Sequence, residues 1–284
     1  MKKSPGPKKP AGTTRKPVTS KAVPQPAALM SRLPGRGNLY VVLSLLVFGL
    51  VLYGNTIFNK YAIDDNLVVS NELVEKGLKA IPEIFSTHYF SQEGNVGSSS
   101  ADYRPVVKAT FALEHQLWGK KPGRSHLINI LLYVALSVLL FYILKRLLYN
   151  YNILFPYLVT LVFMAHPVHT EVVASLKNRD EMMAFLCGLG TLWSILNYAD
   201  TKKIRYLALA PLLFLTGYLC KSSILPFLIL IPLVLVFFNR MPVKKVAPVF
   251  IVLLVVALIA QMGPNLFLPS AERIKSYIEN PPLS

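Results

Sequence analysis

Charged residues are scarce in this sequence. They make up 15% of the 284 residues, whereas 53% are hydrophobic, and an ordinary globular domain has about 25% charged residues. This shortage argues against a chain that lives in water alone. Cysteine is also rare, and because Cys187 and Cys220 both lie in apolar runs, a disulfide scaffold is not expected.

Long apolar runs account for much of the chain. Several are about 20 residues long, which is enough to cross a hydrocarbon core about 30 Å thick. In lipid, such a run must satisfy its backbone hydrogen bonds within its own segment and is therefore a helix. We predict an all-α, polytopic membrane helix bundle with about seven transmembrane helices, at residues 38–57, 126–144, 151–167, 181–198, 206–220, 223–238 and 246–262.

Acidic residues are absent from the first 36 positions, which hold nine Lys and Arg residues of a chain with net charge +16. The segment is also rich in proline, glycine, serine and threonine, so residues 1–37 are predicted to be a disordered tail. An arm that binds nucleic acid is one reading of such a segment. A cytoplasmic, lipid-facing tail fits better, because a membrane span follows directly, and no nucleic-acid partner is expected.

The connections between the predicted spans set the orientation. With the tail in the cytoplasm, the loops after spans two, four and six are also inside. They are rich in basic residues, as the positive-inside rule requires: Lys145, Arg146, Lys202, Lys203, Arg205, Arg240, Lys244 and Lys245. We therefore predict a membrane module over 38–262 and an outer C-terminal segment over 263–284.

The first outer loop, residues 58–124, is long and holds most of the acidic residues. Apolar residues recur every three or four positions in Asn66–Ile84 and Val106–Trp118, which predicts helices. Between them, the Gly- and Ser-rich segment Gln92–Ala101 is predicted to be mobile. A long outer loop with helices of its own is a natural place for chemistry.

Ionisable residues near a membrane are costly and usually have a function or a partner. On the predicted orientation, the unusual polar residues all gather on the outer face, and His126 and Asn129 share one helix face there. The set of candidate site residues is Asp64, Asp65, Arg104, His126, Asn129, His166, His169, Glu171, Arg179, Asp180 and Lys221.

Each candidate also has a plainer interpretation. Asp64 and Asp65 are either a solvated pair or neighbours whose repulsion suits one of them to accept a proton. His166, His169 and Glu171 are possible metal ligands, although Pro167 argues against the regular helix that such a pair prefers. Arg179 is alternatively a structural clamp with Asp180 or Glu171, and Lys221 alternatively extends to the membrane surface.

The ordered motifs resemble a known family. Asp64-Asp65, Asp102-Tyr103-Arg104-Pro105, the His126…Asn129 pair, Ala165-His166-Pro167…His169-Thr170-Glu171 and Asn178-Arg179-Asp180 resemble the amino-terminal half of GT-C-fold glycosyltransferases. Within these, they are similar to the transmembrane-and-tetratricopeptide O-mannosyltransferases and, more distantly, to the dolichyl-phosphate-mannose protein mannosyltransferases. The resemblance covers about residues 38–240.

The resemblance implies a membrane enzyme that moves a sugar of the mannose type from a polyprenyl-phosphate donor to a hydroxyl of a protein or glycan outside the cytoplasm, with inversion at the anomeric carbon. It implies that Asp64 or Asp65 is the base and that Arg179 and Lys221, with His166 or His169, hold the lipid phosphate. Arg104, His126, Asn129, Glu171 and Asp180 are then substrate-binding or structural residues. The donor is a substrate, and no metal or other cofactor is firmly implied.

Two departures from the family pattern are visible. Ser222 follows Lys221 where the family usually has glutamate, and relatives continue with further spans, which predicts a fragment or a shortened member. A non-catalytic scaffold of the same fold is therefore one alternative and a transporter another, although the charges lie at the outer edge and not at the midplane. The predicted location is a bacterial inner membrane, with the endoplasmic-reticulum membrane as the alternative.

Overall fold

The computed structural model describes residues 35–87 and 103–267. Every regular element within these residues is a helix, which confirms the predicted all-α membrane bundle. Most of the predicted basic tail (1–37), the segment Gln92–Ala101 and most of the predicted segment 263–284 lie outside the described residues.

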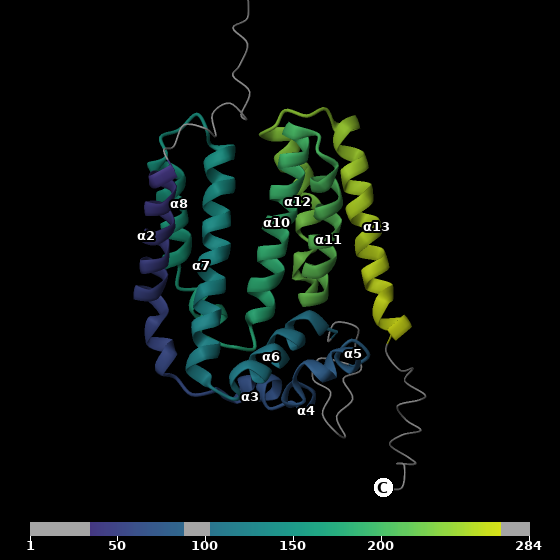
Figure 1. Ribbon diagram of the computed structural model, residues 1–284. Coiled ribbons are helices and arrows are strands. Elements are labelled where there is room, and N and C mark those ends of the chain that lie inside the picture. Colours follow the sequence, from purple (N-terminus) through teal and green to yellow (C-terminus); the bar gives the residue numbers. More distant parts are fainter. Residues whose placement is uncertain (1–34, 88–102, 268–284) are drawn as a thin grey trace, which may run out of the picture.

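Apolar helices stand side by side and form the bundle (Figure 1). Four candidate spans are long and apolar enough to cross a membrane. The first combines α2 (Gly35–Tyr53) with the turn of helix that follows it to Phe58, and the others lie in α7 (Pro122–Leu147), α10 (Arg179–Thr201) and α13 (Val243–Phe267). Three shorter apolar helices occupy the other predicted positions: α8 (Leu154–Ala165), α11 (Ile204–Cys220) and α12 (Phe227–Phe237). The count of seven spans therefore stays a prediction.

Proline ends one of the short helices and lies inside the other two. It cannot donate a backbone hydrogen bond, and it pushes the residue before it towards an extended conformation. Thus α8 ends at Ala165, because His166 precedes Pro167 and is extended at φ −65° and ψ 125°. Pro211 lies inside α11 and Pro232 inside α12.

The long helix α7 begins earlier than predicted. Its first residue is Pro122, whose missing N–H and fixed φ suit the first position of a helix. As a result, His126 and Asn129 lie within the helix, one and two turns from its start, and both are buried.

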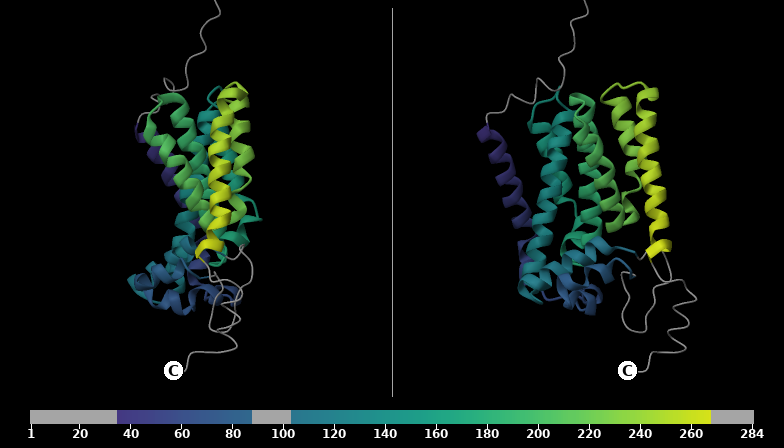
Figure 2. Two further views of the ribbon diagram at one scale, coloured as in Figure 1. Left: turned by 90° about the vertical axis from the view of Figure 1, so that its right-hand side faces the viewer. Right: turned by 45° about the vertical axis from the view of Figure 1, so that its right-hand side comes forward.

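The predicted outer loop forms a layer of short helices across one end of the bundle (Figures 1 and 2). The segment 66–84 is broken into pieces by Ser70, Asn71 and Gly77, and Gly77 has a φ of +68°. The pieces are α3 (Ile63–Val69), α4 (Glu72–Glu75), η3 (Gly77–Ala80) and α5 (Ile81–Ile84), and η2 (Gly54–Phe58) precedes them. The predicted helix Val106–Trp118 is present as α6 (Pro105–Trp118).

Buried apolar residues hold this layer against the bundle. Val68 of α3 and Phe111 of α6 belong to the same core cluster as Leu192 of α10 and Phe214 of α11. Burial of such side chains stabilises a fold by about 1.5–3 kcal/mol each. The layer is therefore an integral part of the fold.

The two ends of the bundle differ in charge. We call the end that carries α3–α6 the loop end and the opposite end the basic end. The basic end has the connections of α7 to α8, α10 to α11 and α12 to α13 (Figure 1). The lysines and arginines listed above for the cytoplasmic side lie in these connections or in the adjoining helix ends.

Close packing of α10 against α11 fixes the loop-end terminus of α11. A Cβ atom on Gly217 would overlap Ile224, which lies in η5 (Ser222–Ile224), and would lie 2.7 Å from the Cβ of Cys187. Real Cβ atoms do not approach other heavy atoms so closely. Glycine at this position lets the turn that begins with Lys221 lie directly against α10.

Candidate active site

Arg179, the first residue of α10, lies in the centre of the loop end and is only 1% exposed. Its guanidinium pairs with Glu114 of α6, and its Nε donates to Asn129 Oδ1 of α7 at 2.8 Å. It also donates to the carbonyl oxygen of Ser125 at 3.3 Å and lies 4.0 Å from the ring centre of Phe111. Arg179 thus joins three helices from the inside.

The next residue, Asp180, joins a second group that is partly exposed. Its buried carboxylate pairs with Arg104 and, at 3.3 Å, with Lys221 Nζ. Lys221 also lies 2.8 Å from Glu181, which accepts a hydrogen bond from the Ser223 hydroxyl at 2.6 Å. We call Arg104, Asp180, Glu181, Lys221 and Ser223 the charge cluster. Because Arg104, Lys221 and Glu181 retain 14%, 22% and 38% side-chain exposure, a solute can reach it.

The adjacent aspartates of α3 have different environments. Asp65 is fully buried: one oxygen accepts from the Ala62 amide at 3.0 Å, and the other accepts from the Ser175 hydroxyl at 3.3 Å and the Lys177 amide at 3.1 Å. Asp64 has 60% side-chain exposure and pairs with Lys177 Nζ at 2.9 Å. Asp65 therefore holds the segment before Arg179 in place, whereas Asp64 faces the solvent.

Asn129 completes the buried support of that segment. Its amide group donates to the carbonyl oxygens of Val173 and Ser175 at 3.4 and 3.2 Å, while its oxygen accepts from Arg179. His126 lies one turn earlier on α7 and is 1% exposed. His126 and Asn129 are therefore both buried in the protein interior and are not part of the exposed surface of the candidate site.

The two histidines flank the start of α9 (His169–Ala174) and have different surroundings. His166 is exposed, and its Nδ1 accepts from the Val168 amide at 3.2 Å. His169 Nδ1 lies 2.8 Å from the Phe163 carbonyl oxygen and 3.1 Å from the Tyr133 hydroxyl, and burial lowers the pKa of His169. The two ring centres are 6.0 Å apart.

Neither the histidines nor the acids assemble a metal site in the part of the chain that the structure describes. Within 35–87 and 103–267, no group of three or more His, Cys, Asp or Glu side chains is placed to hold a metal ion. Glu171, the third residue considered as a possible ligand, is exposed on α9.

Eight of the eleven predicted residues lie in α3, α7, α9 and α10, and Arg104, His166 and Lys221 directly flank α6, α8 and α11. Figure 1 shows α3, α6 and the starts of α7 and α10 at the loop end. Contacts bring Asp64, Asp65, Asn129 and Arg179 together through the segment 175–179, and Arg104, Asp180 and Lys221 together in the charge cluster.

At the loop end, two buried charged residues of α6 were not among the predicted site residues. Glu114 is the partner of Arg179, and Lys108 of α6 is 1% exposed. Desolvation lowers the pKa of Lys108 to about 8, against the opposing attraction of Glu83. Their spacing could have indicated that they are buried. Each lies three positions from Phe111, residues three apart share a helix face, and Phe111 lies on the apolar face of α6.

These features define a class: a helical membrane protein with a cluster of paired, partly exposed charged side chains at one end of the bundle. The family model for dolichyl-phosphate-mannose-protein mannosyltransferases matches residues 102–264. This match covers more than half of the chain, and the chain belongs to that family. It begins before Arg104 and includes the charge cluster and Arg179, but it leaves out Asp64 and Asp65.

Individual relatives agree with the family match. The chain is 30% identical over 159 residues to Protein O-mannosyl-transferase TMTC2 of Mus musculus, a match of 54% of this chain and 18% of the relative. It is 28% identical over 165 residues to Protein O-mannosyl-transferase F38B6.6 of Caenorhabditis elegans, a match of 57% and 23%. With Protein O-mannosyl-transferase TMTC3 of Homo sapiens it shares 28% over 189 residues, or 63% and 20%.

The chain thus spans about a fifth of the length of the curated relatives it matches. No solved structure matches it.

Proposed function

We propose that this chain carries the reactive part of a membrane mannosyltransferase that moves mannose from a polyprenyl phosphate to a hydroxyl group of a protein. The observation that carries the proposal is the placement of an exposed carboxylate, Asp64, and the partly exposed charge cluster on one end of a bundle that belongs to a mannosyltransferase family. The relatives' printed names, protein O-mannosyl-transferases, support the sugar and the acceptor class.

We assign the general base to Asp64. A base must reach the acceptor hydroxyl from the solvent side, and Asp64 is exposed, whereas both oxygens of Asp65 are occupied by protein donors. Asp65 is then a positioning residue. A base of this kind contributes about 10²–10⁴ to the rate.

We assign the lipid phosphate to Lys221 and Arg104. Both are cations with exposed surface, and both are anchored by the same buried carboxylate, Asp180. Lys221 also pairs with Glu181, which is the more exposed of its two acidic partners. A phosphate oxygen would take the place of Glu181 on Lys221, so that binding leaves no cation without a partner. His166 is exposed and is assigned a hydrogen bond to the same phosphate.

The burial of Arg179 supports a different role from the phosphate contact suggested by the sequence. Its donors are directed at Glu114, Asn129 and Ser125, so it is a positioning residue that sets the start of α10. Asn129 shares that role through the carbonyls of Val173 and Ser175. His126, His169 and Glu171 are assigned supporting roles around the same segment.

The proposed reaction is a single displacement. Asp64 takes the proton of the acceptor hydroxyl, the hydroxyl oxygen bonds to C1 of mannose, and the bond between C1 and the phosphate oxygen breaks. The electron pair leaves with the polyprenyl phosphate, whose charge Lys221 and Arg104 neutralise. Preorganised charges of this kind supply much of the barrier reduction in enzymes.

We propose that the basic end faces the cytoplasm, because short loops rich in Lys and Arg stay inside. The loop end, and with it the reaction, then lies outside the cytoplasm. For the compartment, the relatives named above come from animals, which supports the endoplasmic reticulum over the bacterial inner membrane.

Replacement of Asp64 tests the proposal. Vesicles that contain the full-length protein are given dolichyl-phosphate mannose and a protein acceptor, and transferred mannose is measured. We expect Asp64→Asn to lower the rate by about 10²–10⁴. Glu72→Gln is the matched control, because Glu72 is an exposed acid of the same layer, and it should leave the rate unchanged.

Two results would contradict the proposal. If mannose transfer continues in the Asp64→Asn variant, Asp64 is not the general base. If the folded, unmodified full-length protein transfers no mannose at all, the alternative of a non-catalytic scaffold is favoured.

A further inference from the structure

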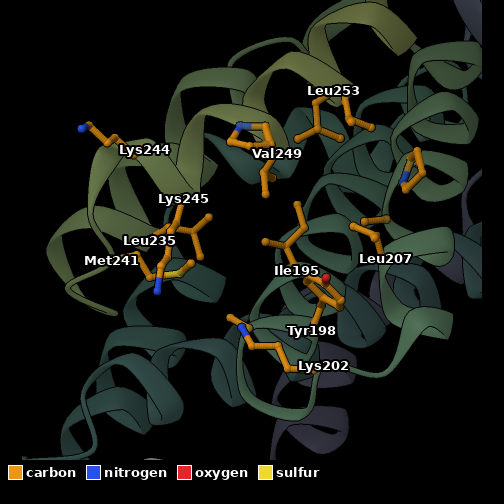
Figure 3. A pocket seen from close by; sticks show the side chains of 15 residues that line it. Ile195, Tyr198, Lys202, Leu207, Leu235, Met241, Lys244, Lys245, Val249 and Leu253 are labelled. Atoms are coloured by element: carbon orange, nitrogen blue, oxygen red, sulfur yellow. The ribbon is translucent and has the colours of Figure 1, made fainter.

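A second site lies at the basic end, away from the proposed reaction. A cavity of about 500 Å³ lies between α10, α11, α12 and α13 (Figure 3). Its volume is typical of small-molecule sites, which range over about 300–1,000 Å³. Most of its wall is apolar, as shown by the lining residues Ile195, Pro211, Leu235, Val249, Val252 and Leu253.

The rim of this cavity has positive charge only. Lys202, Lys244 and Lys245 are lining residues, and no aspartate or glutamate lines it. Asp200, two positions before Lys202, pairs with Arg146 at 2.7 Å. Within residues 35–87 and 103–267, none of the three rim lysines forms an ion pair with a described carboxylate.

The local backbone conformation and a neighbouring tyrosine position the rim lysines. Lys202 ends α10 in the left-handed conformation at φ 55°, and its Nζ lies 5.6 Å from the ring centre of Tyr198. In Figure 3 the amines of Lys202 and Lys245 both lie toward the lower left of the lining side chains, whereas Lys244 extends away from them. Lys202 and Lys245 are therefore the two cations placed to share one anion, with the Tyr198 side chain beside them.

We propose that this cavity binds an anionic membrane phospholipid, with its phosphate on Lys202 and Lys245 and one acyl chain against the apolar wall. The shape of the site matches a molecule that has a charged head and an apolar tail. Lysines at a membrane edge are ordinary by themselves, but here they border an apolar cavity and have no acidic residue among the lining. The proposal does not depend on the transferase activity, which we place at the opposite end of α10 and α11.

Lipid binding to the purified full-length protein tests this. The detergent-solubilised protein is titrated with phosphatidylglycerol, phosphatidylcholine, polyprenyl phosphate and inorganic phosphate, and bound molecules are counted by native mass spectrometry. We expect retention of phosphatidylglycerol over phosphatidylcholine. Each lysine near an anionic lipid contributes roughly a factor of 5 in affinity, so Lys202→Gln with Lys245→Gln should weaken retention by roughly 10- to 30-fold.

Matched variants separate charge from shape. Lys203→Gln with Arg205→Gln removes two charges from the same connection at positions that do not line the cavity, and it should leave binding unchanged. Val249→Trp fills the cavity with the charges kept and should lower retention of phosphatidylglycerol. Unfolding measurements on each variant check that the fold is intact.

Four outcomes would overturn the proposal. Equal losses in the two double variants would mean a general attraction to positive charge. Retention of polyprenyl phosphate alone would assign the site to a different lipid. If inorganic phosphate at equal concentration displaced phosphatidylglycerol, the apolar wall would contribute nothing to binding. Unchanged binding in a folded Val249→Trp protein would place the lipid elsewhere.

Discussion

Two groups of cations, one at each end of the bundle, are held in opposite ways. At the loop end, Arg104, Arg179 and Lys221 each pair with at least one carboxylate, and their partners are buried or half-buried. At the basic end, Lys202 and Lys245 line a cavity whose lining has no acid.

This difference separates two uses of positive charge. A cation paired with a buried carboxylate is fixed in position but has little net charge to offer, so a ligand must replace one of its partners. A cation without such a partner attracts any anion nearby, but its side chain is held less firmly. We associate the first arrangement with a reaction that needs fixed geometry and the second with the capture of an abundant lipid.

The largest effect is expected at the most deeply buried cation. Arg179→Met leaves Glu114 buried without its cation, and removing one partner of a buried pair costs about 3–5 kcal/mol. We expect that decrease in the free energy of unfolding, measured on the solubilised full-length protein by titration with denaturing detergent. Adding Glu114→Gln should recover part of the loss.

Arg205→Met provides the control at the basic end. Arg205 is exposed and contacts the ring and hydroxyl of Tyr206, so the change should be within about 0.5 kcal/mol. If both arginine variants lost similar amounts of stability, the contrast between the two ends would not hold.

A smaller loss is expected from close packing beneath the charge cluster. Gly217→Ala forces a Cβ against Ile224 and Cys187, and overpacking of this kind costs about 1–3 kcal/mol. Gly263→Ala, also in a helix, has no heavy atom within 4 Å of the new Cβ and should gain up to about 1 kcal/mol from helix propensity. The same unfolding titration measures both, and a stabilising Gly217→Ala would show that the turn at Lys221 is free to shift.

The third effect is a dependence of stability on pH. The pKa of Lys108 is lowered to about 8 in the folded protein from 10.5. Below pH 8 both states are protonated and the cost of the buried charge is constant. Between about pH 8 and 10.5 the unfolded state binds more protons, so stability rises with pH. Unfolding midpoints at pH 7.5, 9 and 10 should show this rise, and Lys108→Met should remove it; a rise that persists in Lys108→Met has another source.

The positions of the helices could be predicted from the sequence, but the roles of the charged residues could not. Apolar length and period depend on neighbours along the chain, so α7, α10 and α6 are found near their predicted positions. The interruption of a helix by proline could also be predicted, as at Pro167. Arg179 is different: its partner Glu114 is 65 positions away, and no local pattern reports that they meet.

Two adjacent residues show the same limit. Asp64 and Asp65 are identical in type, yet one is exposed and the other buried, because consecutive helical residues point about 100° apart and only the packing of the segment 175–177 against α3 decides which is covered. The acid expected after Lys221 is a second example. Ser222 stands there, while Glu181 supplies a carboxylate from α10 at 2.8 Å.

The lengths of the helices near the charge cluster have a consequence for the proposed function, because they bear on the directions from which the lipid donor and the protein acceptor reach it. At about 1.5 Å per residue, α7 is roughly 39 Å long, α11 roughly 25 Å and α12 roughly 17 Å. A hydrocarbon core is about 30 Å thick, so α11 is shorter than the core. On the proposed orientation, Lys221, which follows α11, would therefore lie no further out than the headgroups. On the proposed function, the lipid-linked sugar slides in sideways from the bilayer while the acceptor protein descends from the water above α3 and α6, and the two meet at right angles.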